Sequence, residues 1–192
     1  MMPTKVWIFG YGSLIWNPGF AFERRQVGYI RGWARRFYQG SPDHRGIPGS
    51  PGRVVTLVAD TQSICWGVAY QVAGESLESI FSYLDEREQG GFLRHQVDFY
   101  PKTMTTDAPA PAVTAAAVYI AQDDNPHYLG PASVPEMALQ IFHSKGPSGL
   151  NRDYLLRLAE SLRGLGVTDV HVTELEHYVR QLDAQRKDRS SG

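Results

Sequence analysis

The part of the sequence that most constrains this chain is the run of residues 6–16, where an apolar segment leads directly into two closely spaced glycines. Residues 6–9 are apolar and favour a β-strand. Gly10 and Gly12 end that strand, because residues without a Cβ let the chain turn sharply and bring its amides close to a ligand. Successive N–H groups after a strand form a concave anion site, and the Ser13 hydroxyl adds one donor. The run therefore predicts a strand, a tight turn and a carboxylate-binding site.

Other interpretations of this run are less specific. A Gly-x-Gly after a strand is often only a turn, and that interpretation stays open at this point. The run is not a dinucleotide-binding fingerprint, because Ile15 stands where a third glycine is required. It is not a nucleophile elbow either, because Gly-x-Ser-x-Gly is absent, so Ser13 is not expected to act as a hydrolase nucleophile.

The bulk composition predicts an ordinary globular protein. The chain has 192 residues, of which 42% are hydrophobic and 20% charged, which is enough to bury a sizeable core. We expect one domain over 1–187 and a flexible polar tail over 188–192. The net charge of −1 argues against nucleic acid or a membrane surface as partner. Cys65 is the single cysteine, so no intrachain disulfide framework is expected, and without an apolar leader or span the expected location is cytoplasmic.

The pattern of apolar residues predicts a strand-rich first part and a helical second part. Strands are expected at 5–9, 26–31, 33–40, 53–59, 64–72, 94–100 and 113–121. Helices are expected at about 75–88, from 133 onward, at 151–163 and at 171–186. Two loops stand out. The segment 40–52 contains four glycines and three prolines and is either a functional lid or a mobile surface loop, and 103–111 is a plain hairpin connection.

The helix expected at 75–88 carries a carboxylate in an unusual place. Its apolar stripe consists of residues at helical spacing, namely Leu77, Ile80, Phe81 and Leu84. Glu88 falls at about 20° on the helical wheel, on the centre line of that stripe. Partial burial and the electronegative C-terminal end of a helix both disfavour its charged form. A glutamate in this position is suited to accept and return a proton near neutral pH.

A structural explanation of Glu88 stays open beside this one. An arginine such as Arg87 or Arg94 can pair with Glu88 as a salt bridge that serves stability alone. The six histidines show no spacing typical of metal ligands, so no metal site is predicted.

Taken together, the motifs of this chain resemble the ChaC family of glutathione-specific γ-glutamylcyclotransferases. The resemblance extends over about residues 5–180, nearly the whole chain, and the order of the motifs makes it specific. The matching segments are 7–16, 35–46, 51–57, 66–70, 83–88, 125–131 and 146–155. Two departures are small: Tyr38 stands where the family often has tryptophan, and the loop 103–111 is longer.

The resemblance implies an α+β fold, in which a mixed, barrel-like β-sheet is surrounded by helices. It implies cleavage of glutathione to 5-oxoproline and Cys-Gly, with no cofactor or metal. Glu88 matches the catalytic glutamate of the family, and Arg45 is a candidate for the glycine carboxylate of glutathione, its alternative being a solvated loop arginine. The turn that matches the substrate-binding loop comprises Gly10, Tyr11, Gly12, Ser13 and Leu14.

Two other functions stay open on the sequence alone. The first is a cyclotransferase that acts on other γ-glutamyl amino acids or on γ-glutamyl amines, since only the leaving-group side differs. The second is a non-catalytic regulatory protein that binds a γ-glutamyl ligand. Glu88 separates the second from an enzyme, because a binding module does not need an isolated carboxylate on a buried helix face.

Overall fold

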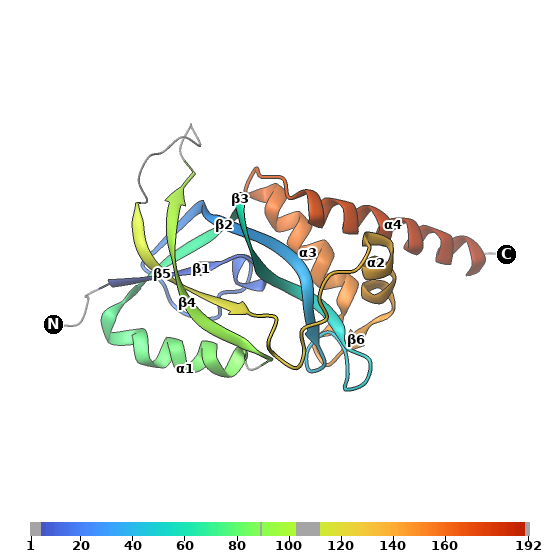
Figure 1. The fold of residues 1–192 in the computed structure, drawn as a ribbon, viewed down its shortest axis with the longest axis horizontal. Coiled ribbons are helices and arrows are strands. Elements are labelled where there is room, and N and C mark those ends of the chain that lie inside the picture. Colours follow the sequence, from blue (N-terminus) through green and yellow to red (C-terminus); the bar gives the residue numbers. More distant parts are fainter. Residues whose placement is uncertain (1–4, 89, 103–111, 191–192) are drawn as a thin grey trace. The chain divides into compact units, whose positions relative to one another are not determined.

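The computed structural model describes residues 5–88, 90–102 and 112–190 (Figure 1). The chain forms two compact units. The first unit comprises Met1–Arg35 and Leu57–Gln122, and the second comprises Arg36–Thr56 and Asp123–Gly192. The single domain over 1–187 stays a prediction, and the two units are described separately below.

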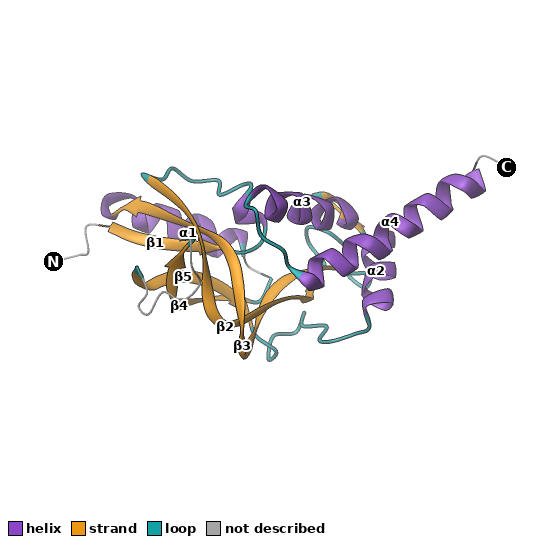
Figure 2. Cartoon of the chain, turned by 90° about the horizontal axis from the view of Figure 1, so that it is seen from above, coloured by secondary structure: helices purple, strands orange, loops and turns teal. Residues whose placement is uncertain are grey.

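Five strands form a closed barrel in the order β1-β3-β2-β4-β5 (Figure 2). β1 pairs antiparallel with β3 and parallel with β5, and β4 pairs antiparallel with both β2 and β5. The mixed barrel expected from the resemblance is therefore confirmed. The strands are β1 (Lys5–Gly10), β2 (Arg24–Ser41), β3 (Gly52–Ala73), β4 (Phe92–Pro101) and β5 (Val113–Ala121).

Two pairs of expected strands are in fact single long strands. The segments 26–31 and 33–40 are both part of β2, and 53–59 and 64–72 are both part of β3. Gly32 lies within β2 at a φ of 81°, a conformation that glycine adopts readily, so the strand bends there without ending. The break in the apolar pattern therefore wrongly predicted the end of a strand. The hydrogen bonds between strands are made by backbone groups, which continue through such a break. Both strands run from one unit into the other.

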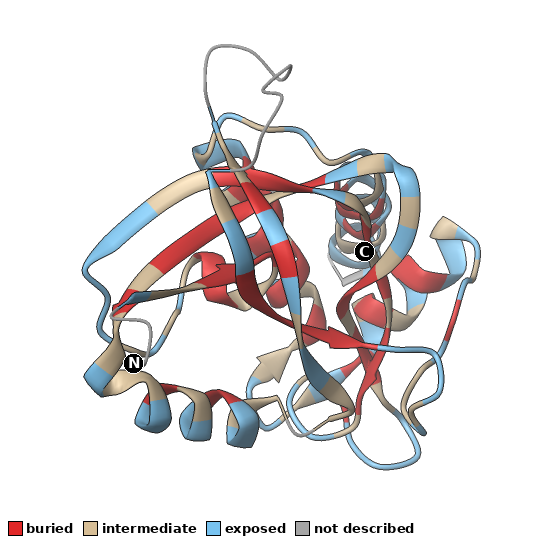
Figure 3. Cartoon of the chain, turned by 60° about the vertical axis from the view of Figure 1, so that its left-hand side comes forward, coloured by how far each residue is buried: buried red, intermediate tan, exposed pale blue. Residues whose placement is uncertain are grey.

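One helix covers part of the barrel in the first unit. α1 (Leu77–Arg87) follows a short 3₁₀ turn, η2 (Gly74–Ser76), so the helix expected at 75–88 is confirmed with a slightly later start. Figure 3 shows the buried face of α1 turned toward the strands. The cluster that joins helix and strands consists of Ile8, Leu14, Val72, Ile80, Leu84, Ala117 and Tyr119. Cys65 on β3 is also buried, at 1% exposure.

The second unit contains three helices and a small hairpin. The helices are α2 (Val134–His143), α3 (Asn151–Gly164) and α4 (Val170–Ser190), and the hairpin strands are β6 (Lys145–Gly146) and β7 (Gly149–Leu150). Ser133 caps the beginning of α2: its side chain accepts the N–H of Glu136, and the backbone N–H of Ser133 donates to the Glu136 side chain. Buried apolar residues of these helices include Met137, Ala138, Ile141, Leu155, Leu158, Leu162, Val172, Leu175 and Val179.

The remaining expectations concern loops and the C-terminal end. α4 is helical through Ser190, and the flexible tail over 188–192 stays a prediction. The loop 103–111 lies outside the described residues. Among the residues that the structure describes, no helix is both long and apolar enough to cross a membrane.

Candidate active site

The glycine turn, defined here as residues 10–16, follows directly from the end of β1. A 3₁₀ turn, η1 (Ser13–Ile15), begins after Gly12, and the N–H of Ile15 donates to the carbonyl of Gly12 at 3.0 Å. The first N–H groups of a helix have no partner within it. In the described part of the chain, the amides of Ser13 and Leu14 have no hydrogen-bond acceptor. The turn therefore presents the N–H groups of Ser13 and Leu14 as backbone donors, and its role as a carboxylate site stays a prediction.

Close packing and side-chain hydrogen bonds fix the backbone of the glycine turn. A Cβ on Gly10 would lie 2.6 Å from the Cβ of Leu14, so only glycine fits there without a shift. The hydroxyl of Tyr70 donates to the carbonyl of Leu14 at 2.7 Å, and burial raises the pKa of Tyr70. The buried Arg35 donates from Nε to the carbonyl of Tyr11 at 2.8 Å. These contacts use carbonyl groups of the turn and leave the N–H groups of Ser13 and Leu14 available.

Glu88 lies immediately after the last residue of α1. Its N–H donates to the carbonyl of Leu84 at 2.9 Å, which ends the helix. Its side chain is 18% exposed, so the partial burial expected from the helical spacing is confirmed. Its expected preference for the protonated form stays a prediction.

Arg87 is the neighbour of Glu88 and also contacts the glycine turn. Its Nε lies 3.6 Å from the Oε1 of Glu88, and its Nη2 donates to the Oγ of Ser13 at 2.7 Å. Its Nη1 donates to the carbonyls of Asn17 and Pro18 at 2.8 and 3.2 Å. The salt bridge considered for Glu88 is thus present with Arg87, and the same guanidinium joins the turn to the end of α1.

A tyrosine of β5, Tyr119, is hydrogen-bonded to Asp85 near the end of α1. The hydroxyl of Tyr119 donates to the Oδ1 of Asp85 at 2.5 Å, and the hydroxyl of Tyr11 donates to the backbone carbonyl of Tyr119 at 2.7 Å. Burial raises the pKa of Tyr119, and the negative charges of Asp85 and Glu88 raise it further. The Tyr119 hydroxyl therefore favours its neutral form, and it lies within electrostatic range of Glu88.

The first unit thus brings together the glycine turn and Glu88, two features that are far apart in the sequence. Sequence reasoning missed three residues that support them, namely Arg35, Asp85 and Tyr119, and treated Arg87 only as a salt-bridge partner. One signal was present: Arg35 is a charged residue inside a strand, where only a fixed hydrogen-bonding role justifies its burial at 1% exposure.

Arg45 belongs to the second unit and is described within it. Its Nη1 donates to the carbonyl of Leu150 at 3.2 Å, and its guanidinium lies 5.7 Å from the ring centre of Tyr154. Burial lowers the pKa of Arg45. The loop that carries it is folded rather than extended, because the Oγ of Ser41 accepts the N–H groups of His44 and Arg45.

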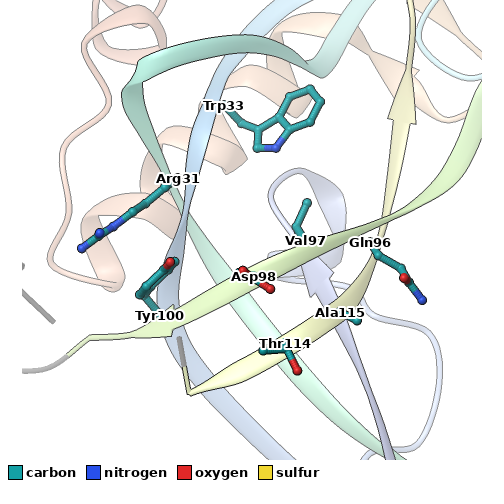
Figure 4. Close-up of a pocket in the computed structure, with 8 residues that line it drawn as sticks. All are labelled: Arg31, Trp33, Gln96, Val97, Asp98, Tyr100, Thr114 and Ala115. Atoms are coloured by element: carbon teal, nitrogen blue, oxygen red, sulfur yellow. The ribbon is translucent and has the colours of Figure 1, made fainter. Parts of the chain in front are cut away.

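An open pocket of about 550 Å³ lies elsewhere in the first unit (Figure 4). Arg31 extends beside Tyr100 there, with its guanidinium 4.4 Å from the ring centre. The pocket adjoins Ala115, which has a φ of 58° opposite an irregularity in β4. The pocket shares no residue with the glycine turn or Glu88, and the β4 residues that line it begin at Gln96. We therefore do not take it as the active site.

Comparison with known proteins identifies the family of this chain. The family model for ChaC-like proteins matches residues 6–182. This chain belongs to the ChaC-like family. A glutathione-specific γ-glutamylcyclotransferase 1 from Danio rerio is 49% identical over 90% of this chain and 88% of its own length. The γ-glutamylcyclotransferase 2-3 of Arabidopsis thaliana is 46% identical over 92% of this chain and 89% of its own length.

A solved structure gives the same result for the fold. The crystal structure of a glutathione-specific γ-glutamylcyclotransferase from yeast superposes with a TM-score of 0.86. It is 30% identical in sequence and covers 93% of this chain and 97% of the yeast chain. The barrel of this ChaC-like chain is therefore that of a γ-glutamylcyclotransferase.

Proposed function

We propose that this ChaC-like chain is an enzyme that cleaves glutathione into 5-oxoproline and Cys-Gly. The relatives that are up to 49% identical along most of the chain carry that activity in their names. The observation in this chain that carries the proposal is a half-buried carboxylate, Glu88, joined through Arg87 to a turn with available N–H groups. A carboxylate-binding turn beside a proton acceptor is what cyclisation of a γ-glutamyl group requires.

The glycine turn is the proposed site for the α-carboxylate of the γ-glutamyl group. The amides of Gly12, Ser13 and Leu14 and the hydroxyl of Ser13 would donate to it, since charge-assisted bonds from successive N–H groups hold an anion well. This contact leaves the α-amino group at the edge of the turn, where Glu88 can take up its proton. Gly10 and Tyr11 contribute by fixing the path of the backbone.

Glu88 is the proposed proton carrier. It takes a proton from the α-ammonium, and the freed amine attacks the δ-carbonyl carbon, forming the C–N bond of the five-membered ring. The C–N bond to cysteine then breaks, and Glu88 returns the proton to the departing nitrogen. When Cys-Gly departs as its ammonium, two protons have left the α-nitrogen and two have reached the cysteinyl nitrogen, so the step balances without water. A backbone N–H of the turn is suited to stabilise the intermediate oxyanion.

Because the nucleophile belongs to the substrate, the proposed reaction needs no enzyme nucleophile and no cofactor. The main task of the protein is to hold the γ-glutamyl group folded for ring closure. Correct placement of the two reacting groups contributes about 7–11 kcal/mol in well-oriented intramolecular reactions. Contact of Arg45 with the glycine carboxylate, and a cytoplasmic location, stay predictions.

The test is incubation of the purified protein with glutathione, with 5-oxoproline and Cys-Gly followed by mass spectrometry. γ-Glutamyl-alanine and γ-glutamyl-lysine run in parallel, and Glu88→Gln is the control. We expect turnover of glutathione alone, lost in the variant. Turnover of another γ-glutamyl compound instead would keep the reaction and change the substrate. Binding of glutathione without product by the folded protein would favour the non-catalytic alternative.

A further inference from the structure

Arg87 makes contacts that a simple ion pair does not require. We propose that Arg87 is a positioning residue that couples the carboxylate-binding glycine turn to Glu88, so that one guanidinium sets both substrate placement and the charge state of the proton carrier. The inference rests on the proposed function of this site. It concerns a residue that contacts Ser13 and Glu88 rather than the reacting atoms.

The geometry uses the fork shape of the guanidinium. Nη1 donates to the carbonyls of Asn17 and Pro18, at the exit of the turn. Nη2 donates to the hydroxyl of Ser13, at the beginning of η1, and Nε faces Glu88. A planar group with five N–H donors holds these partners in one arrangement, which the point charge of a lysine does not do.

The bond to Ser13 also determines what its hydroxyl can do. A guanidinium has no acceptor, so the Oγ of Ser13 must accept from Arg87 and its O–H hydrogen is free to donate elsewhere. In the described residues Ser13 Oγ has no other hydrogen-bond partner. Arg87 therefore orients Ser13 as a donor, which is the role that a substrate carboxylate needs.

The contact with Glu88 is electrostatic rather than a close hydrogen bond. Its N–O separation is 3.6 Å, and the two side chains are 17% and 18% exposed, so water screens the pair less than it screens a surface ion pair. Asp85 on α1, Arg94 on β4 and Glu88 all act electrostatically on Tyr119 of β5, so these charged or titratable groups lie in the same region. The charge of Asp85 opposes ionisation of Glu88, whereas the positive charges of Arg94 and Arg87 favour it, and Arg87 contacts Glu88 directly.

The experiment compares Arg87→Met, which removes the charge and the fork, with Arg87→Lys, which keeps the charge alone. Wild type, Ser13→Ala, the Ser13→Ala/Arg87→Lys double variant and Glu88→Gln are measured beside them with glutathione. Arg24→Gln, at an exposed arginine that begins β2, is the matched control for loss of one positive charge. For each protein, kcat and KM are determined across pH, and folding is checked by circular dichroism.

We expect Arg87→Lys to raise KM at least ~10-fold, the effect of losing a hydrogen bond that involves a charged group, while the acidic limb of the rate profile stays in place. Arg87→Met should raise KM similarly and also move that limb to higher pH by about one unit, because an opposite charge at this distance favours the ionised carboxylate. In the double variant, KM should be no higher than in Ser13→Ala alone, since Arg87 acts on KM through Ser13.

Each outcome bears on a separate claim. Wild-type KM and an unmoved acidic limb in folded Arg87→Met would overturn the inference. If Arg87→Met does not fold, the Arg87→Lys variant provides the test. A wild-type KM in Arg87→Lys would overturn the inference. So would a double variant whose rise in KM equals the product of the rises in the two single variants. Wild-type turnover that Glu88→Gln abolishes, together with unaffected Arg87 variants, removes this inference and keeps the proposed function. Absence of wild-type turnover removes both.

Discussion

Two arginines, one in each unit, both donate hydrogen bonds to backbone carbonyls, but their remaining partners differ in chemistry. Arg53 in the second unit donates to the carbonyls of Phe37 and Gly130 at 2.9 and 3.1 Å and to the Oε1 of Gln140 at 2.6 Å. Arg87 in the first unit donates to two carbonyls as well, but its other partners are a hydroxyl and a carboxylate.

The difference lies in what the partners of each arginine can still do once they are bound, namely donate a further hydrogen bond or take up a proton. The acceptors of Arg53 are two backbone carbonyls and an amide, none of which can ionise, and Arg53 is 6% exposed. After Arg87 has bound them, Ser13 keeps a hydroxyl hydrogen that can donate and Glu88 keeps a carboxylate that can take up a proton. We therefore expect Arg53, with its fixed neutral acceptors, to serve stability, and Arg87, beside a hydroxyl and a carboxylate, to serve the proposed reaction. The following predictions test this division, from the largest effect to the smallest.

The largest effect is expected at Glu88. Glu88→Gln should lower kcat for glutathione at least ~10²-fold, because the amide cannot carry the proton. The matched control is Glu86→Gln, two residues earlier and exposed to solvent, which should keep the wild-type rate. Steady-state kinetics with thermal unfolding of all three proteins provide the measurement. A folded Glu88→Gln protein with a near-normal rate would show that Glu88 is not the proton carrier.

Arg53→Met should lower the free energy of unfolding by about 2 kcal/mol, because it leaves buried carbonyls without a donor. Urea denaturation measures this loss. At a temperature where the variant is folded, its kcat and KM should equal those of the wild type. An altered KM with unchanged stability would contradict the assignment of Arg53 to stability and of Arg87 to the reaction.

Gly12→Val should raise KM for glutathione about tenfold, with a smaller rise for Gly12→Ala, because a side chain at this position keeps the carboxylate away from the N–H groups. Initial rates over a range of glutathione concentrations give KM for both variants. Equal KM values in the wild type and the folded valine variant would place the substrate carboxylate elsewhere.

The smallest effect is expected at Glu176 in the second unit. Burial alone would raise the pKa of Glu176, but hydrogen bonds from Arg163 and Arg180 outweigh it and hold that pKa below the ordinary value of 4.5. A lowered pKa stabilises the folded state above pH 4.5 and stops doing so as the pH falls through the lowered value. Glu176→Gln should therefore cost about 1 kcal/mol at pH 7, and its unfolding curve should meet that of the wild type in acid. A loss that persists at low pH would contradict the ionic explanation.

The sequence predicted the features that depend on local pattern. Apolar runs located every barrel strand, and helical spacing placed Glu88 at the half-buried end of α1. The two long strands were divided wrongly, because Gly32 and the polar residues near Asp60 resemble loop signals, although the backbone ladder continues through them.

The supporting contacts of the site were beyond prediction for a physical reason. Arg87 and Ser13 are 74 residues apart, and Tyr11 and Tyr119 are 108 apart. Such pairs depend on how the barrel closes and on the rotamers of long side chains, which no local periodicity encodes. The resemblance identified the residues of the turn, but not the guanidinium that holds them.

The burial of Cys65 has a consequence for redox chemistry. It is the single thiol of the chain, it is 1% exposed, and its Sγ lies 3.8 Å from the carbonyl of Trp66. Mixed disulfides form through an accessible thiolate. A protein proposed to work on a thiol peptide thus keeps its own sulfur away from exchange with substrate or product, so that oxidation of the glutathione pool removes substrate without modifying the enzyme.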